Sequence, residues 1–228
     1  MEINQLHSWQ VSIQEAARIQ ADLREKVLLQ SKSNFESIQT IAAADVSSHK
    51  FENILYATVV IMQFSPLKFI DCYWEIAPAQ FPYVPGYLSF REAPVILEIC
   101  KKISPPPDVL LCDGQGIAHP RGLGLASHLG LFLDLPTIGC AKSVLVGHYE
   151  EPGPARGEHS PLIYQGRQVG VALRTRSHVK PIFLSCGHKI GLSEAIHIIL
   201  HVSPRYRIPE PLRMAHQIVN EIRVRNQK

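Results

Sequence analysis

Apolar and polar positions follow two periods along this chain, and these periods predict its helices and strands. Helical spacing of apolar residues from about Val11 to Gln30 predicts an amphipathic N-terminal helix. Three β-rich segments follow, at 38–46, 54–64 and 69–77. The connections between them are short, as at 47–53 and 65–68, so the three segments are predicted to form an antiparallel meander.

The rest of the chain alternates short strands with helices. Ser89 is predicted to begin a helix through Lys101, with Glu92 completing a capping box and Pro94 inside the first turns. The remaining predicted elements are strands at 109–112, 137–141, 169–174 and 181–185, an exposed loop at 150–160, and helices at 124–134, 193–201 and 211–224. This order predicts an α/β fold in which a mixed sheet, three antiparallel strands and then parallel strands, is flanked by helices on both faces.

Composition limits the classes of protein that this chain can represent. With 228 residues, 46% of them hydrophobic, the chain can bury one sizeable core, and its length does not require two domains. A formal charge of +3 permits a polyanionic partner without arguing for one. The apolar runs are too short to cross a bilayer, and residues 1–5 lack a signal-peptide pattern, so we expect a cytoplasmic protein without membrane contact.

The five cysteines indicate neither a disulfide framework nor a metal site. Their number is odd, no C-x-x-C pair occurs, and most of them lie in apolar runs. We therefore expect buried, reduced thiols.

Two isolated aspartates are the first candidates for chemistry. Asp113 ends the apolar strand Val109–Cys112 and precedes two glycines, at the strand end where open α/β sheets bind ligands. Asp45 lies among small apolar residues in the first strand, where an unpaired charge is costly to bury. If these strands are neighbours, the two carboxylates stand side by side and favour a divalent cation such as Mg²⁺ between them. The alternatives are an Asp-Gly turn at Asp113 and a solvent-facing Asp45 on an edge strand.

Three further residues have both a functional and a structural interpretation. Glu92 lies at a helix start, where the capping box alone would explain it. Lys142 follows the strand at 137–141 and is either a fixed cation over a phosphate or the polar end of that strand. His216 lies on the last helix, where a lone histidine is usually structural.

Taken together, five segments resemble the motifs of the endonuclease V family, over residues 38 to 222. The segment Phe81-Pro-Tyr-Val-Pro-Gly86, followed by Arg91-Glu92, resembles the wedge loop and catalytic glutamate of that family. Asp113-Gly-Gln-Gly-Ile-Ala-His-Pro-Arg121 is similar to its metal and base-pocket motif. The other matching segments are Ala44-Asp-Val46, Pro136–Lys142 and Arg207–His216.

The resemblance implies a ribonuclease-H-like fold and a single catalytic domain over residues 1–228. It also implies cleavage of nucleic acid at the second phosphodiester bond 3′ of hypoxanthine (inosine), leaving a 3′-hydroxyl and a 5′-phosphate. Mg²⁺ is the expected cofactor, with Mn²⁺ as a substitute. The implied metal-site residues are Asp45, Glu92, Asp113 and His216, of which the last varies in the family between His and Asp. Lys142 would stabilise charge in the transition state.

Substrate contacts are implied for the wedge loop and the glycine-rich loop. Tyr83, stiffened by Pro82 and Pro85 within the loop that includes Val84 and Gly86, would fill the gap left by an extruded base. Gly114, Gln115 and Gly116 would line the base pocket. His119 and Arg121 would contact phosphate or base, or else hold the loop. The expected partner is deoxyinosine-containing DNA, with inosine-containing RNA as the alternative, and the protein is expected to be a monomer.

Two other classes of function remain open. One is another ribonuclease-H-like nuclease that selects flaps or mismatches with the same acids and a different pocket. The other is a nucleic-acid-binding module with a dead site. Because all three acids and Lys142 are present, the sequence favours an enzyme.

Overall fold

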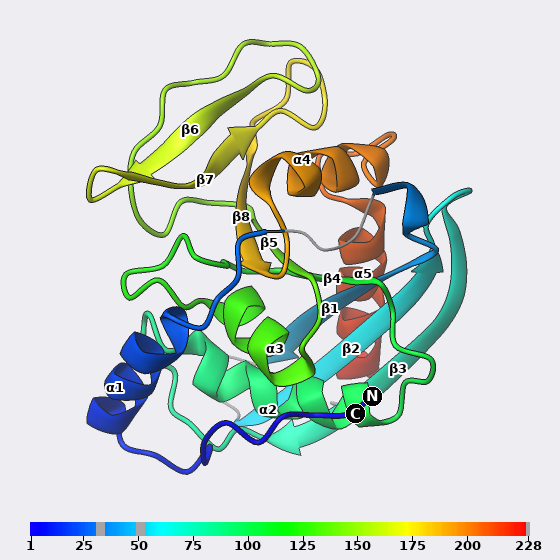
Figure 1. Ribbon diagram of the computed structural model, residues 1–228. Coiled ribbons are helices and arrows are strands. Elements are labelled where there is room, and N and C mark those ends of the chain that lie inside the picture. Colours follow the sequence, from blue (N-terminus) through cyan, green and yellow to red (C-terminus); the bar gives the residue numbers. More distant parts are fainter. Residues whose placement is uncertain (31–34, 49–52, 227–228) are drawn as a thin grey trace.

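One mixed sheet of eight strands organises the protein. The computed structural model describes residues 1–30, 35–48 and 53–226. The strands, in chain order, are β1 (Thr40–Ser48), β2 (Ile54–Gln63), β3 (Lys68–Pro78), β4 (Val109–Cys112), β5 (Thr137–Ala141), β6 (His159–Tyr164), β7 (Arg167–Leu173) and β8 (Ile182–His188). Their order across the sheet is β3-β2-β1-β4-β5-β8-β7-β6 (Figure 1).

The sheet confirms the predicted meander and the predicted switch to parallel pairing. β1 pairs antiparallel with β2, and β2 pairs antiparallel with β3; residues 49–52 of the predicted first connection lie outside the described residues. β4 joins the other side of β1 in parallel, and β5 joins β4 in parallel. Beyond β5, pairing is antiparallel again through β8, β7 and β6. Parallel pairing therefore covers only the centre of the sheet.

Helices cover both faces of this sheet, as predicted. They are α2 (Leu88–Lys101), α3 (Leu125–Leu133), α4 (Leu192–His201) and α5 (Glu210–Asn226). α1 (Ile13–Arg24) packs against α3, and a short 3₁₀ turn, η1 (Phe35–Ser37), precedes β1. α4 and α5 pack into one apolar cluster and α2 and α3 into another (Figure 1). Alternate residues of β1 face the two clusters, Ile41 and Ala43 on one side, Ala42 and Ala44 on the other.

The start of α2 differs from the prediction. The helix begins at Leu88 after Tyr87, with no side-chain cap, and it continues through Pro94. Ser89 lies inside the first turn and is buried, so it does not form a capping box with Glu92. The box fails because Ser89 is already helical, whereas an N-cap residue must have a non-helical backbone. A capping box does begin α1, where Ser12 and Glu15 bond reciprocally.

Other elements also differ from the prediction. α1 ends at Arg24 rather than near residue 30, and Gly191, not Ser193, precedes α4. Strand β6 was missed, because the segment at 150–160 is predicted as a loop and Pro161 interrupts the apolar pattern that follows it. Proline is tolerated there because β6 is an edge strand of the sheet.

The expectation about the cysteines is confirmed, since all five are free, four of them are buried and Cys72 is half-buried. Within the described ranges, no helix combines the length and apolar character needed to span a membrane.

Candidate active site

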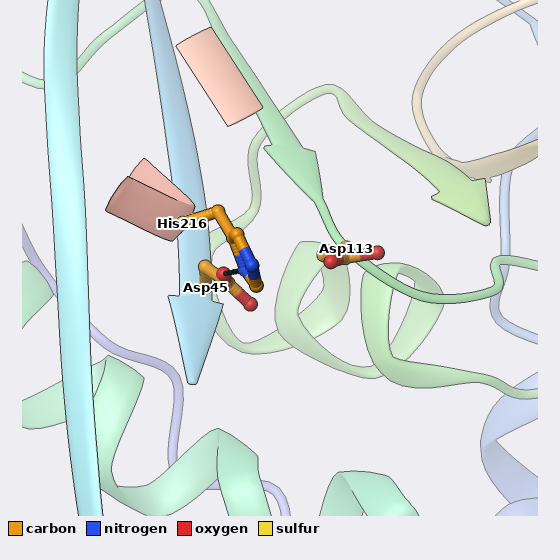
Figure 2. A group of neighbouring side chains, drawn as sticks. All are labelled: Asp45, Asp113 and His216. Atoms are coloured by element: carbon orange, nitrogen blue, oxygen red, sulfur yellow. Dashed lines mark hydrogen bonds and ion pairs between the residues drawn. The ribbon is translucent and has the colours of Figure 1, made fainter. Parts of the chain in front are cut away.

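Two carboxylates and a histidine meet where β1 and β4 run side by side. Because Ala44 pairs with Cys112 across the parallel strands, the next residues, Asp45 and Asp113, are neighbours. α5 packs against β1 and brings His216 to the same place. One ligand atom from each of these three side chains lies within 4.8 Å of the other two (Figure 2). The predicted proximity of Asp45 and Asp113 is therefore present in the structure.

Negative charge accumulates at this cluster. Burial, and then the charge of Asp113, raises the pKa of Asp45, which the hydrogen bond from His216 opposes. Glu92 reaches the same region from α2 and is only partly exposed. Burial, followed by the charges of Asp45 and Asp113, raises the pKa of Glu92 to about 8. Among the described residues, no group donates a hydrogen bond to the Glu92 carboxylate. The acids thus repel one another and lack full compensation.

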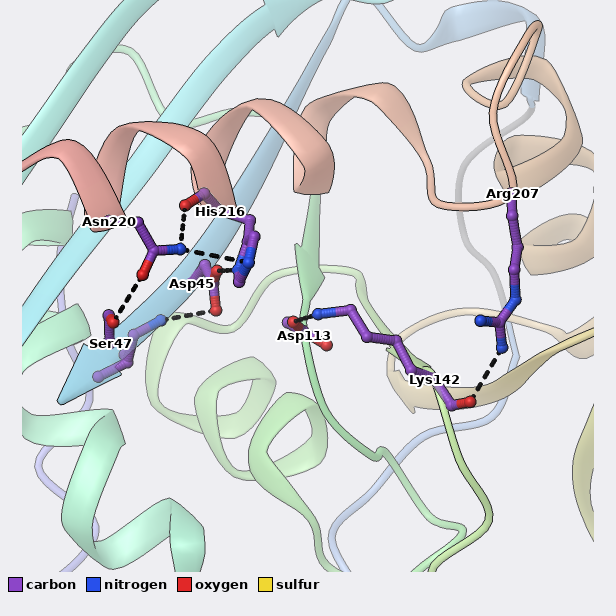
Figure 3. A network of polar contacts seen from close by, with 8 residues as sticks. Asp45, Ser47, Asp113, Lys142, Arg207, His216 and Asn220 are labelled. Carbon is purple, nitrogen blue, oxygen red and sulfur yellow. Dashed lines mark hydrogen bonds and ion pairs between the residues drawn. The ribbon is translucent and has the colours of Figure 1, made fainter. Parts of the chain in front are cut away.

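A chain of hydrogen bonds fixes the orientation of Asp45. His216 Nδ1 lies 2.8 Å from Asp45 Oδ2, and Asn220 Nδ2 lies 3.2 Å from His216 Nε2. Since the Asn220 amide donates, Nε2 accepts and Nδ1 carries the proton that is donated to Asp45. Ser47 donates to Asn220 at 3.0 Å and closes the chain (Figure 3). In this arrangement His216 positions the Asp45 carboxylate.

Lys142 is the cation that faces the cluster. It lies just after β5, and its Nζ donates to Asp113 Oδ2 at 2.6 Å. Arg207 donates to the Lys142 carbonyl at 2.9 Å (Figure 3). It also donates to the Pro181 carbonyl at 2.8 Å, and together these bonds hold the backbone at Lys142 in place. Lys142 opposes the negative charge at Asp45 and Arg91 opposes it at Glu92, yet burial and mutual repulsion still raise the pKa of both carboxyls.

This donor set suits a hard divalent cation. Carboxylate oxygens are the ligands that Mg²⁺ prefers, and they suit Mn²⁺ as well. Asp45, Asp113 and His216 are close enough to share one ion, and Glu92 adds charge beside them. An ion at this position would remove the repulsion that raises the carboxylate pKa values.

A pocket of about 240 Å³ opens beside the acids. It is lined by the loop before α2, by the loop after β4 and by residues that follow β5; the lining includes Tyr83, Val84, Pro85, Gly86, Ser89, Gly114, Gln115, His119 and Leu145. Tyr83 is 72% exposed, so its ring stands free of the core. Pro82, in the same loop, is also exposed. The predicted wedge loop and the predicted pocket loop therefore form one site.

Three donors hold the carbonyl of Gly86. His119 Nε2 lies 3.0 Å from this oxygen, Arg121 Nη2 2.5 Å and Gln20 Nε2 3.1 Å. The Arg121 guanidinium also donates to the Gln20 amide oxygen and lies 4.0 Å from the centre of the Tyr87 ring. Burial, and then the charge of Arg121, lowers the pKa of His119 to about 4. Of the roles considered for His119 and Arg121, their contacts favour holding the loop.

The two residues after Gly114 have different surroundings. Gln115 lines the pocket, and its Nε2 donates to the Ser143 carbonyl at 3.3 Å. Its Oε1 is buried and has no hydrogen-bond partner among the residues that the structure describes. Gly116 packs against β8 instead, and a Cβ there would lie 2.0 Å from the Cys186 carbonyl oxygen. Its N–H donates to Ser185 Oγ at 2.8 Å. Gly116 thus permits a close approach of backbone to backbone and does not line the pocket.

Sequence reasoning missed Gln20, Asn220 and Arg207. Each contacts a site residue. The contacts of Gln20 and Arg207 join residues far apart in sequence, and that of Asn220 joins two residues of one helix. Asn220 is one helical turn after His216, a spacing that could have indicated the pair. Gln20 bonds Gly86 across 66 residues, and no local pattern signals that contact.

Comparison with known proteins identifies the family of this chain. The endonuclease V family profile matches residues 21–217. An Endonuclease V from Nostoc punctiforme is 47% identical over 214 residues, which cover 94% of this chain and 96% of that protein. The crystal structure of Endonuclease V from Streptomyces avermitilis is 37% identical, with a TM-score of 0.92 and coverage of 97% of both chains.

A structure with nucleic acid is also similar. It is Ciona intestinalis Endonuclease V in complex with a 24mer DNA containing an inosine followed by a ribo-adenosine. It is 27% identical to this chain, with a TM-score of 0.82, and the match covers 95% of this chain and 99% of that one. These matches also confirm the predicted ribonuclease-H-like fold. The chain therefore belongs to the endonuclease V family, and it is a nuclease that acts on phosphodiester bonds.

Proposed function

We propose that this protein is a Mg²⁺-dependent endonuclease that recognises hypoxanthine in DNA and hydrolyses the second phosphodiester bond 3′ of it. The products would carry a 3′-hydroxyl and a 5′-phosphate. The observation that carries the proposal is the position of the pocket, which lies directly beside the acid cluster. Asp113 and Gly114 are consecutive, so one loop contributes to both, and a base in the pocket places its own strand near the carboxylates.

The acids would hold the metal ion and the lysine would face the phosphate. Asp45, Asp113 and His216 are the proposed ligands, with Glu92 as the fourth member of the site. When bound, Mg²⁺ supplies charge neutralisation at the scissile phosphate and activates water for attack. In the metal-free site, His216 and Asn220 keep the Asp45 carboxylate oriented. For His216 to bind the ion, one of its ring nitrogens would have to leave its present hydrogen bond. Lys142, drawn away from Asp113 by the incoming phosphate, would stabilise the charge that develops on its oxygens.

Recognition would require extrusion of the base. Extrusion costs a few kcal/mol in a normal duplex and less at a weak pair, so the lesion itself favours it. Tyr83 is exposed at the rim of the pocket, where its ring can stack in place of the lost base. The buried Gln115 Oε1 has no hydrogen-bond partner in the described part of the chain, so the pocket has a polar group available for a ligand.

The relative from Ciona supports the substrate class, because its complex holds DNA with an inosine. The ribonucleotide that follows the inosine in that complex makes inosine-containing RNA the second candidate substrate. A monomeric state, a cytoplasmic location and a single catalytic domain stay predictions from the sequence.

Matched DNA and RNA oligonucleotides, each with a single inosine, test the proposal. We expect cleavage with Mg²⁺ or Mn²⁺ that EDTA abolishes, and no comparable cleavage of adenosine controls. A preference for flaps or mismatches without inosine would support the other class of nuclease. Cleavage of the RNA alone would show that the substrate is inosine-containing RNA and not DNA.

A further inference from the structure

A chain of hydrogen bonds runs from the N-terminal segment to the wall of the pocket. His7 Nδ1 lies 2.8 Å from the Ser8 carbonyl oxygen, and His7 Nε2 lies 2.7 Å from His128 Nε2. His128 Nδ1 lies 2.9 Å from Ser89 Oγ. Ser89 is 2% exposed and lines the pocket from the first turn of α2. Two histidines thus connect a distant carbonyl to a pocket hydroxyl.

The direction of each bond follows from the group at the far end. A carbonyl oxygen can only accept, so His7 carries its proton on Nδ1. A neutral His7 then presents an unprotonated Nε2, and His128 must donate from its own Nε2. That leaves His128 Nδ1 without a proton, so Ser89 donates its hydroxyl proton to His128. The chain therefore has one polarity as long as both rings are neutral.

The surroundings keep both rings neutral. His128 is fully buried, and the rings of Trp9, Phe90 and Phe132 surround the pair. Burial, with smaller contributions from His7 and His119, lowers the pKa of His128 well below its usual value. Burial also lowers the pKa of His7, against the hydrogen bond to Ser8. No carboxylate interacts with either ring among the described residues.

We propose that Ser89 is a specificity-determining residue that accepts a hydrogen bond from N1–H of hypoxanthine, because the His7–His128 pair fixes its hydroxyl as an acceptor toward the pocket. Its proton is committed to His128, and in the described parts of the chain its side chain has no other hydrogen bond. The inference rests on the proposed function, and it identifies N1–H as the group of the base that Ser89 would recognise.

This polarity separates hypoxanthine from adenine. N1 of hypoxanthine carries a hydrogen, whereas N1 of adenine carries a lone pair that would oppose the lone pairs of Ser89. A buried polar site rejects a ligand that leaves its groups unpaired much more strongly than it rejects a small change in size. Guanine also has N1–H, so its exclusion depends on the room available for its 2-amino group.

The test compares two substrate bases in Ser89→Ala. One DNA duplex carries hypoxanthine, and a second carries unsubstituted purine, which lacks both N1–H and the 6-oxygen. We expect Ser89→Ala to lower kcat/KM for hypoxanthine by about tenfold relative to purine, the effect of one buried hydrogen bond. An equal change for both bases, or an unchanged preference, would overturn the inference.

A second variant tests the histidine pair without altering the pocket. In His7→Phe, His128 loses the acceptor for its Nε2 proton and can protonate Nδ1 instead, which turns the Ser89 hydroxyl into a donor. The preference for hypoxanthine over purine should again fall about tenfold. Trp9→Phe is the matched control, since it retains an aromatic ring against His7 and His128, and its preference should match the wild type. If His7→Phe retains the full preference for hypoxanthine over purine, the histidine pair does not set the direction of the Ser89 hydroxyl.

Nitrogen chemical shifts of the wild-type protein provide a measurement independent of folding in the variants. Long-range ¹H–¹⁵N spectra should show the Nδ1–H form of His7 and the Nε2–H form of His128 at neutral pH. The opposite forms, or a charged ring, would overturn the inference. If the wild-type enzyme cleaves no hypoxanthine substrate, the proposed function fails, and the inference fails with it. If it cleaves hypoxanthine but Ser89→Ala keeps the full preference, the inference alone fails.

Discussion

The acid cluster and the Gly86 loop lie next to each other, and their polar groups are satisfied to opposite degrees. Around the Gly86 carbonyl, three donors serve one acceptor, and Gln20 is fully buried among them. At the acid cluster, burial and mutual repulsion raise the pKa of Asp45 and of Glu92. The polar groups around the Gly86 carbonyl are therefore satisfied without a ligand, whereas the carboxylates of the acid cluster are not.

This difference separates two requirements of one reaction. A loop that must replace an extruded base works best when its position is fixed before binding, because less entropy is then lost. A metal centre needs acids whose mutual repulsion is relieved when a cation binds. We therefore expect mutations in the two regions to have different effects, with chemistry lost at the acids and selectivity lost at the loop.

The largest effect is expected for Asp113→Ala. This change removes a proposed metal ligand and the partner of Lys142, so cleavage of an inosine duplex should fall by about 10³-fold or more. Binding of the same duplex should survive, as measured by anisotropy. Asp71→Asn, at an exposed acid on β3, is the matched control. Full activity of Asp113→Ala would exclude this residue from the chemistry.

The pH dependence of stability tests the repulsion at Glu92. Its pKa is about 8 in the folded protein against a reference value of 4.5, so the folded state holds the proton more tightly. In the metal-free protein, the contribution of Glu92 to stability should therefore be fully present below about pH 4.5 and should be lost as the pH rises through 8. Thermal unfolding in EDTA across this range measures the loss, and Mg²⁺ should restore more stability at high pH than at low pH.

Two variants sharpen this test. Glu92→Gln should flatten the pH dependence, with a gain on the order of 1–3 kcal/mol at high pH. Glu98→Gln, at an exposed position on the same helix, should leave it unchanged. A Glu92→Gln protein with the wild-type slope would show that the acids are compensated after all.

A smaller effect is expected at the exposed wedge. Tyr83→Ala removes a ring that can stack on neighbouring bases, a contribution of about 1–3 kcal/mol. Binding should weaken about tenfold for an inosine duplex and less for an inosine single strand, where no gap is left in a stack. Tyr83→Phe keeps the ring and should bind normally. Equal losses on duplex and single strand would argue against a wedge.

The smallest effect on binding is expected at Gln20. Gln20→Leu preserves volume but removes donors from the Gly86 and Leu123 carbonyls and an acceptor from Arg121. The free energy of unfolding should fall by about 1–3 kcal/mol, and inosine binding should weaken about threefold. Mn²⁺ affinity, measured by calorimetry, should not change, and the exposed Gln10→Leu should affect neither quantity. A loss of Mn²⁺ affinity would show that the two regions are not independent.

Much of the sheet could be predicted because its signals are local. The apolar run that ends at Asp113 marked β4, and the short connections marked the meander. Strand β6 escaped because Pro161 is excluded from central strands, and only tertiary structure shows that β6 is an edge. Likewise, Ser89 has the residue type of a cap, and its partner, His128, lies on another helix.

The candidate site was predictable to the extent that its residues lie at strand ends. Asp45 and Asp113 could be placed together because parallel neighbours end at the same edge of a sheet. The glycines after Asp113 are alike in sequence, yet Gly114 lines the pocket and Gly116 packs against β8. Gln20 contacts the Gly86 carbonyl and His7 contacts His128. Both contacts depend on how the N-terminal segment folds back, which no local pattern in the sequence shows.

In the proposed function, pocket and acids form one site that cleaves at a fixed distance from the extruded base. The most direct test moves a single inosine one nucleotide at a time along otherwise identical DNA duplexes and maps each cut at nucleotide resolution with Mg²⁺ present. We expect the cut to move in step with the inosine and always to fall at the second phosphodiester bond on its 3′ side. Cuts that stay at one position, or that vary in distance from the inosine, would contradict it.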